Sequence, residues 1–513
     1  MTDPQGLSRD SENTEVDRDR EHRRDVYIGV LVVMGAVLYR PLIFWADNAW
    51  DLAAPQDMLT TVIIELLVAL GVFAIALRAS GRAIASAFVV GAVVFAILDW
   101  GSIDEPVPFL VFAAVAMAVV TVSLRATAEA ARKTALIVIA ITLVVPIFQL
   151  VASHVQKSKA YPLITVESPT DAVATGQIED IVVVVVDGYP MAWIAESWFG
   201  HDMEPIRSKL GAEGFTTPSV SWSHNTFTSV ALPTLLQLTQ VVDTTADQDW
   251  QNQRTNHAVL RGENFTAGAL RTAGFDYIHI ESGWNGDICG RADVCLDSSW
   301  PDEINWQLLG ASALGPVMES RWASQNVGNS KTVVDQLVSL DVFDDGRHDF
   351  VYAHMMLPHS PFVVDEECIL RPPVERIDTE DPDNVSSQLA CVDGMLARIV
   401  DRVGPNTAIM IIGDHGTATR DQLSRDTSEW TDADIAERLG AFLSYRMPPD
   451  CTGPEMATNM LTLRAIVACA IQVELPSSEP GFVIGLRSVE PVSRSTVTQI
   501  GERLVDGVIS RSD

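Results

Sequence analysis

The sequence predicts a protein in two parts, an N-terminal bundle of about five transmembrane helices and a C-terminal α/β domain with a mainly parallel sheet. The composition is 47% hydrophobic although the formal net charge is -32, because apolar and acidic residues occupy different segments. Residues 26–153 are mostly apolar. Beyond residue 178, short apolar runs alternate with amphipathic helical stretches, which is typical of a parallel sheet covered by helices.

Five apolar segments of the N-terminal part predict the transmembrane helices, since each is near the ~20 residues that cross ~30 Å of hydrocarbon. A buried helix of a soluble protein can imitate one such segment, but hardly five in succession. The charged residues 1–25 that precede them show no periodic pattern of apolar residues, and they predict a disordered tail. The expected spans are roughly 26–45, 58–77, 84–101, 107–124 and 134–153.

The charges between these segments predict the orientation in the membrane. Basic residues occur in the tail, in the second loop and in the fourth loop, whereas the first and third loops carry only acids. Basic loops stay in the cytoplasm. We therefore expect a multi-pass protein of the cell membrane, with a cytoplasmic N-terminus and with residue 154 onward outside. The basic residues are Arg9, Arg18, Arg20, Arg23, Arg24, Arg78, Arg82, Arg125, Arg132 and Lys133.

All six cysteines lie in the C-terminal part, as three pairs of sequence neighbours without the spacing of a metal site. Three local disulfides are the simplest interpretation, and they agree with an oxidising compartment. The alternative is a set of buried free thiols, which the apolar run around Cys469 allows. The cysteines are Cys289, Cys295, Cys368, Cys391, Cys451 and Cys469.

We expect a polar linker over 154–178 and the α/β domain over 179–513. The acidic balance of this part argues against nucleic acid as a partner, because phosphate backbones require Lys and Arg. The β-branched run Ile181–Val186 predicts a strand that is buried on both faces. Further strands are expected at Tyr277–Ile280, Phe350–Tyr352 and Ala408–Ile412, and helices near 203–213, 258–273, 331–340 and 386–403.

Polar residues follow three of these strands, at the edge where a parallel sheet binds its ligands. Asp187 ends the first strand, His354 and His359 belong to another, and Asp414 with His415 follow a third. Each alone has an ordinary interpretation, a turn or a packed histidine. Together, carboxylates and imidazoles at one edge predict a site for a divalent cation such as zinc or manganese.

The segment Ser223–Leu236 predicts a hydroxyl-rich turn followed by an apolar helix. The hydroxyl-bearing residues of interest in it are Thr226, Thr228 and Ser229. A hydroxyl at a helix start commonly caps the helix. The same position suits catalysis, because the amides and the dipole there stabilise an anion and a metal can activate a coordinated hydroxyl.

Taken in order, these motifs resemble the membrane-bound branch of the alkaline phosphatase/sulfatase superfamily, which includes lipoteichoic acid synthases and lipid A phosphoethanolamine transferases. The resemblance runs through Val-Val-Asp187-Gly, the hydroxyl turn, His354…Leu-Pro-His359-Ser-Pro and Gly-Asp414-His415-Gly. The layout of five spans before the domain is similar as well.

In those families a threonine five residues before a proline becomes covalently loaded, and Thr228 stands in that relation to Pro233. The resemblance also implies that His359 lies near the transferred phosphoryl group. It implies one metal ion held by Asp187, Thr228, Asp414 and His415.

The departures from the family pattern bear on the substrate. The turn has no Cys-x-Pro-x-Arg signature, so sulfate-ester hydrolysis is disfavoured. It also lacks the cysteines that flank the threonine in the lipid A transferases. Asp187 stands where the families have Glu, and no second Asp follows it, which disfavours a two-metal site. A substrate-binding histidine of the transferases is missing after His415. Expected substrate-binding residues are His354, Arg420 and His224.

The resemblance implies a phosphoryl-ester transferase that works outside the cytoplasm through a covalent phospho-threonine and one divalent ion, Mn or Zn before Mg or Ca. It would move a phospholipid headgroup, of phosphoglycerol or phosphoethanolamine type, to an envelope glycan or lipid. A first alternative is a phosphodiesterase or phosphatase with water as acceptor. A second alternative, of another class, is a non-catalytic membrane scaffold or binding protein.

The orientation can be tested with a phosphatase reporter that is active only outside the cytoplasm. We expect activity when it is fused after residue 160 and none when it is fused after residue 80, because the second loop is basic. The opposite pattern would contradict the orientation.

Overall fold

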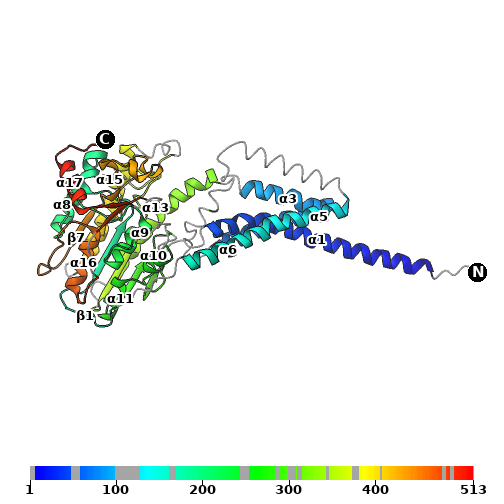
Figure 1. The fold of residues 1–513 in the computed structure, drawn as a ribbon, viewed down its shortest axis with the longest axis horizontal. Coiled ribbons are helices and arrows are strands. Elements are labelled where there is room, and N and C mark those ends of the chain that lie inside the picture. Colours follow the sequence, from blue (N-terminus) through cyan, green and yellow to red (C-terminus); the bar gives the residue numbers. More distant parts are fainter. Residues whose placement is uncertain are drawn as a thin grey trace, which may run out of the picture. The chain divides into compact units, whose positions relative to one another are not determined.

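The computed structural model divides the chain into two compact units (Figure 1). One unit comprises Met1–Ala160 with Glu303–Glu319, and the other comprises Tyr161–Asp302 with Ser320–Asp513. The structure describes residues 6–47, 58–98, 127–160, 169–242, 253–284, 289–297, 308, 315–341, 346–372, 381–404, 407–476, 481–485 and 490–511.

The first unit is helical, and three of its described helical segments are long and apolar enough to cross a membrane: Arg18–Ala46, Met58–Ser80 and Ala128–Val155. The first, second and fifth expected spans are thus confirmed as apolar helices. The third expected span is an apolar helix described over Ala83–Leu98, and the fourth lies outside the described residues. The helices are α1 (Gly6–Asp47), α2 (Met58–Ser80), α3 (Ala83–Leu98), α5 (Ala128–Ile139), the π-helical η3 (Ala140–Val144) and α6 (Val145–Ala160).

Large apolar side chains cover the outside of this helical unit, as expected for a surface in contact with lipid. Leu67 is 66% exposed, Ile75 72% and Phe148 71%. Where helices meet, small residues allow close approach. A Cβ on Gly35 of α1 would lie 2.2 Å from Oγ1 of Thr142 in η3.

The structure differs from the sequence-based expectation in the N-terminal tail. Residues 1–25 were expected to be disordered, but α1 begins at Gly6 and continues through this polar segment into the apolar one. Arg and Glu are good helix formers, and ion pairs one helical turn apart support the extension. Arg23 lies 3.9 Å from Asp19, and Arg24 lies 4.0 Å from Glu21.

The second unit is built on a six-stranded sheet with the order β4-β3-β5-β2-β6-β7. The first five strands of that order are parallel, and β7 is antiparallel to β6. The four strands expected from the sequence are confirmed, and β4 and β7 extend the sheet at its two edges. The strands are β2 (Ile181–Val186), β3 (Asp276–Ile280), β4 (Val294–Leu296), β5 (Asp349–Met355), β6 (Ala408–Ile412) and β7 (Leu443–Arg446).

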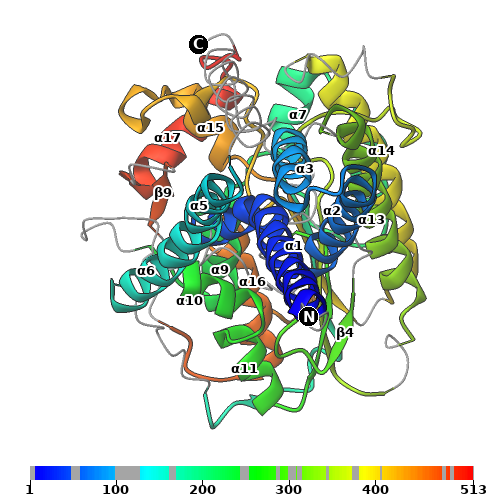
Figure 2. The same ribbon diagram turned by 90° about the vertical axis from the view of Figure 1, so that its right-hand side faces the viewer.

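Two hydrophobic cores cover the two faces of this sheet, as the buried β2 requires. Val182, Val184 and Val186 belong to one core, and the alternate residues of the strand belong to the other. The first core includes α13 and α14, which lie side by side in Figure 2. Arg398 of α14 also pairs with Asp335 of α13 at 2.6 Å. The second core includes α9, α10, α11 and α16.

The helical stretches expected in this unit are confirmed near α8, α13 and α14, whereas the stretch 258–273 is two helices. Gly262, at φ 93°, ends the first of these, and the side chain of Asn264 caps the second. The helices are α7 (Ala192–Phe199), α8 (Glu204–Ala212), α9 (Thr228–Gln237), α10 (Gln253–Leu260), α11 (Phe265–Thr272), α13 (Gly315–Ser339), α14 (Pro382–Arg402), α15 (Asp432–Leu439), α16 (Asn459–Ala470) and α17 (Arg494–Val505), with 3₁₀ turns η5 (Gln422–Ser424) and η6 (Thr427–Glu429). Two small antiparallel sheets join β1 (Val173–Ala174) to β8 (Ile471–Gln472) and β9 (Phe482–Ile484) to β10 (Glu490–Val492).

The six cysteines form the three local disulfides expected from their spacing: Cys289–Cys295, Cys368–Cys391 and Cys451–Cys469. The alternative that Cys469 is a free thiol is wrong. Cys469 lies in an apolar run of α16, but the loop before this helix places Cys451 beside it. Their Cα–Cα distance is 5.6 Å, which a disulfide spans.

Disulfide mapping of the unreduced protein should therefore find these three linkages and no free thiol. Replacing both Cys451 and Cys469 by Ser should cost about 3 kcal/mol of unfolding free energy in the chain-entropy estimate for a loop of this length. The matched control is the Cys289→Ser/Cys295→Ser variant. Its bridge joins cysteines 6 rather than 18 residues apart and so closes a shorter loop. The loss of unfolding free energy should therefore be about 1 kcal/mol smaller. A larger loss in the control would contradict the loop-length account.

Candidate metal centre

Asp187 and Asp414 lie at the same edge of the sheet because the strands before them, β2 and β6, are parallel neighbours. The Asp187 amide donates to the carbonyl of Met355 at 2.9 Å, and the Gly188 amide donates to Oδ1 of Asp414 at 3.0 Å. The turn after one strand is thereby bound to the turn after the other. One ligand atom from each of Asp187, Asp414 and His415 lies within 4.8 Å of the others, and all three residues are buried.

His415 is the centre of this group. Its Nε2 lies 3.3 Å from Oδ2 of Asp414, 3.7 Å from Oδ1 of Asp187 and 3.1 Å from Oγ1 of Thr228. Ligand atoms at zinc distances around a tetrahedral ion are about 3.3 Å apart. The spacing therefore fits one ion with four protein ligands.

Two carboxylate oxygens of the group are buried without a hydrogen-bond partner, Oδ1 of Asp187 and Oδ2 of Asp414. Burying a charged oxygen without a partner is costly, and such groups are rare. Both oxygens are the ones that approach Nε2 of His415. A divalent cation bound between them would compensate their charge, so the residues present fit a metal ion.

The protonation states of the group suit metal binding. Burial alone would raise the pKa of Asp187, but the nearby His359 and the hydrogen bond from His354 outweigh it and hold the pKa below its usual range. Burial, together with the charge of Arg438, lowers the pKa of His415 to about 4, so its imidazole is neutral at neutral pH. Nδ1 of His415 lies 2.9 Å from the carbonyl of Gly416, which can only accept. We therefore assign the proton to Nδ1, which leaves the lone pair of Nε2 for the cluster.

Thr228 is the first residue of α9. The residue before it, Phe227, has extended backbone and no side-chain capping bond. The hydroxyl of Thr228 is directed at His415. The hydroxyl of Thr226 instead accepts from the Gly485 amide at 3.2 Å, which gives it a structural contact.

His359 lies beside the cluster on its exposed side. Its ring centre is 6.3 Å from that of His415, and its Nδ1 lies 2.6 Å from the carbonyl of Ser360. Gly188 has φ 69°, and a Cβ there would lie 3.5 Å from Cα of His359. The left-handed turn after Asp187, which glycine favours, thus lies in ordinary contact with the backbone of His359.

The three other residues expected to bind substrate are engaged within the protein. His354 is fully buried, with Nε2 at 3.5 Å from Oδ2 of Asp187. His224 lies 3.0 Å from the hydroxyl of Thr458 and is stacked on Phe482. Arg420 pairs with Asp434 at 3.1 Å. A role in substrate binding stays a prediction, and these contacts do not favour it.

Two buried charged residues at the end of α15, Glu437 and Arg438, were not predicted from the sequence. Glu437 accepts hydrogen bonds from the hydroxyls of Thr417 and Thr419 and from the amide of Gln422. It thereby organises the loop that follows His415. The neighbouring Arg438 is also buried. In the sequence both resemble ordinary surface charges of an amphipathic helix, and no local pattern distinguishes them.

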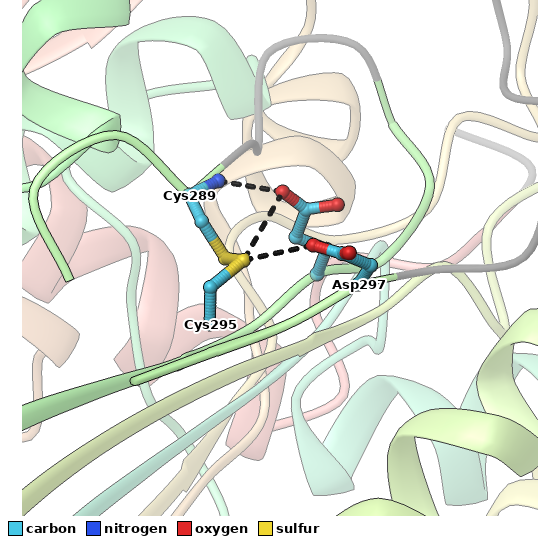
Figure 3. A group of neighbouring side chains, drawn as sticks. Cys289, Cys295 and Asp297 are labelled. Atoms are coloured by element: carbon cyan, nitrogen blue, oxygen red, sulfur yellow. Dashed lines mark hydrogen bonds between the residues drawn. A yellow bond between two sulfur atoms is a disulfide. The ribbon is translucent and has the colours of Figure 1, made fainter. Parts of the chain in front are cut away.

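A second group of potential ligands, Glu281, Cys289, Cys295 and Asp297, lies at the ends of β3 and β4 (Figure 3). Here the two sulfur atoms form a disulfide. A metal binds the thiolate form of cysteine, which a disulfide does not provide. The acidic pair then remains as an exposed or half-exposed surface group, and the fit to a metal is poor.

No family model and no curated protein matches the chain. Solved structures do match. The integral membrane lipooligosaccharide phosphoethanolamine transferase A (EptA) from Neisseria meningitidis is 10% identical, covering 86% of this chain and 98% of its own, with a TM-score of 0.42. The C-terminal periplasmic domain of EptC from Escherichia coli, in complex with zinc, is 9% identical over 60% of this chain and 87% of its own, with a TM-score of 0.41.

A protein in the alkaline phosphatase superfamily from Vibrio parahaemolyticus also matches, with 11% identity, a TM-score of 0.37, and coverage of 69% of this chain and 95% of its own. The matching structures are thus of the group that the sequence motifs resemble. At these identities and TM-scores the likeness by itself assigns no activity to this chain.

The metal centre can be tested by elemental analysis of protein equilibrated with zinc or manganese. We expect about one ion per chain from the ligand count, and loss of the ion in Asp414→Ala. Asp393→Asn is the control, because it removes a carboxylate that binds Tyr189 at 2.6 Å outside the cluster. Because burial lowers the pKa of the metal-free His415 to about 4, proton competition for this ligand should weaken metal binding only as the pH falls towards 4. An ion retained in Asp414→Ala would mean that the metal binds elsewhere.

Proposed function

We propose that the chain is a membrane-anchored, metal-dependent transferase of a phosphoryl-ester group that works outside the cytoplasm, with Thr228 as its nucleophile. The observation that carries the proposal is the hydroxyl of Thr228 at the start of a helix, 3.1 Å from Nε2 of His415 in a buried Asp–Asp–His cluster. A hydroxyl in such a place has a function that capping does not explain.

Asp187, Asp414 and His415 would hold the ion together with Thr228, and the two oxygen and one nitrogen donors of the first three suit zinc or manganese before magnesium or calcium. When bound, a divalent cation lowers the pKa of a coordinated hydroxyl and offsets charge on phosphoryl oxygens. The first amides of α9 supply a further positive potential for the same anion.

In the first step, Oγ1 of Thr228 forms a bond to the phosphorus of a phosphodiester while the bond from phosphorus to the leaving alcohol breaks. With a phospholipid as donor, the leaving alcohol is diacylglycerol, which takes up a proton. In the second step an acceptor hydroxyl forms a bond to the same phosphorus, the bond to Oγ1 breaks, and a proton returns to Thr228. The exposed imidazole of His359, beside the cluster, is suited to bind a phosphoryl oxygen or to move one of these protons.

The donor and acceptor classes rest on the apolar helices, which would keep the site near lipid. We propose a phospholipid headgroup of phosphoglycerol or phosphoethanolamine type as the transferred group and an envelope glycan or lipid as acceptor. If water takes the place of the acceptor, the same residues act as a phosphodiesterase. The non-catalytic alternative is disfavoured, because every residue that the chemistry needs is present in one place.

The nucleophile can be identified with bis(p-nitrophenyl) phosphate, a phosphodiester that reports release of its alcohol. Thr228→Ala should abolish turnover while the fold is retained, because the change at a helix start costs only about 1 kcal/mol. After trapping, peptide mapping should place the added mass on Thr228. Thr226→Ala and Ser229→Ala are the matched controls and should retain at least part of the activity.

Added mass on Ser229, or full activity of Thr228→Ala, would overturn the assignment. Supplying an alcohol such as glycerol separates the two enzymatic alternatives. A transferase should pass the phospho-group to the alcohol, whereas a hydrolase should release it to water.

A further inference from the structure

Arg438 is a buried cation that contacts the two loops of the metal centre. Its side chain is at the end of α15 and only 4% of the residue is exposed. Nη1 donates to the carbonyl of Gly416 at 2.7 Å, and Nη2 donates to the carbonyl of Thr226. The guanidinium carbon also lies 5.2 Å from the centre of the Phe227 ring. One residue therefore contacts the chain directly after His415 and directly before Thr228.

This side-chain contact adds to two backbone bonds from α15, in which the Gly416 amide donates to the carbonyl of Arg438 at 3.0 Å and the Ser223 amide donates to that of Leu439 at 2.7 Å. Phe227 offers no side-chain capping bond, so the helix start is not held by the usual device. The segment before Thr228 is anchored through Thr226, by its hydroxyl to Gly485 and by its carbonyl to Arg438. Only the second of these anchors leads back to the loop of His415.

The charge of Arg438 is retained despite its burial. Burial lowers its pKa to about 10, and the nearby Asp414, Asp187 and Glu437 oppose that effect. At neutral pH the side chain is thus a cation with donors in a rigid plane. A planar group that donates to two carbonyls in fixed directions sets the distance between their backbones.

We propose that Arg438 is the positioning residue that holds the hydroxyl of Thr228 against His415 by binding both loops with one guanidinium. The role in turnover rests on the proposed function, whereas the binding of the two loops does not. A lysine keeps the charge but has a single nitrogen at its tip, so Arg438→Lys removes the bridge while disturbing the buried charge least.

The chain offers a matched control in Arg446 on β7. This second buried arginine, 8% exposed, donates to the carbonyls of Glu213 at 3.2 Å and Val403 at 3.3 Å. It also lies 5.1 Å from the ring centre of Phe215. The chemistry is the same, but none of these partners belongs to the metal centre. Arg446→Lys therefore reports what the loss of such a bridge does to stability alone.

The first measurement needs no substrate. Amide hydrogen exchange of the full chain in detergent, loaded with zinc, should be faster in both 224–230 and 413–419 for Arg438→Lys. Arg446→Lys should leave both segments unchanged, because its partners lie in other segments. Unchanged exchange in either segment of Arg438→Lys would overturn the proposal.

The second measurement is turnover of bis(p-nitrophenyl) phosphate by the same variants. We expect kcat of Arg438→Lys to fall by about 10²-fold, the cost of a misplacement of about 1 Å, with KM and zinc content close to those of the parent protein. Arg446→Lys should keep its kcat. Equal kcat in the two variants, or loss of zinc in Arg438→Lys, would overturn the positioning role. Inactive parent protein with altered exchange in both segments would instead contradict the proposed function and leave the bridge established.

Discussion

The buried carboxylates of Asp187 and Asp414 impose the constraint on which the rest of the second unit depends. Each has one oxygen without a hydrogen-bond partner, and both oxygens face the same imidazole nitrogen. Two buried negative charges at one sheet edge are costly unless positive charge lies close. Because its lowered pKa leaves His415 neutral, the imidazole does not supply that charge. A bound metal ion, with the cation of Arg438 behind it, would offset the cost.

The backbone around the cluster is shaped to allow this proximity. A Cβ on Gly413 would lie 2.2 Å from the carbonyl of Tyr189, and one on Gly416 would lie 1.9 Å from the carbonyl of Glu437. The glycines on either side of Asp414 and His415 therefore let the turns after β2 and β6 and the helix α15 meet. The charged side chains of Glu437 and Arg438 on α15 then bind these loops from behind.

The two units differ in how they hide apolar surface. In the α/β unit, alternate residues of β2 enter two separate cores, so the strand is buried on both faces. In the helical unit, large apolar side chains such as those of Leu67 and Phe148 remain exposed. A surface of this kind is stable in lipid rather than water. The apolar residues concentrate in this unit and the acidic residues lie mainly elsewhere, so one chain is both apolar and strongly acidic.

The sequence by itself predicted the central strands, three long apolar helices and the residues that gather at the sheet edge, and it favoured the three disulfide pairs, because periodicity, cysteine spacing and strand-end motifs are local properties. It did not determine the helix from Gly6 onward, because charged residues that suit a solvated tail also suit a helix that an apolar span has nucleated. Only the tertiary structure decided which polar side chains face the cluster. His224 and Arg420 have the right chemistry but are held by Thr458 and Asp434. In the sequence Arg438 resembles a surface charge, and only the packing of α15 against the loop after His415 buries it, since burial arises from contacts between residues far apart in the chain.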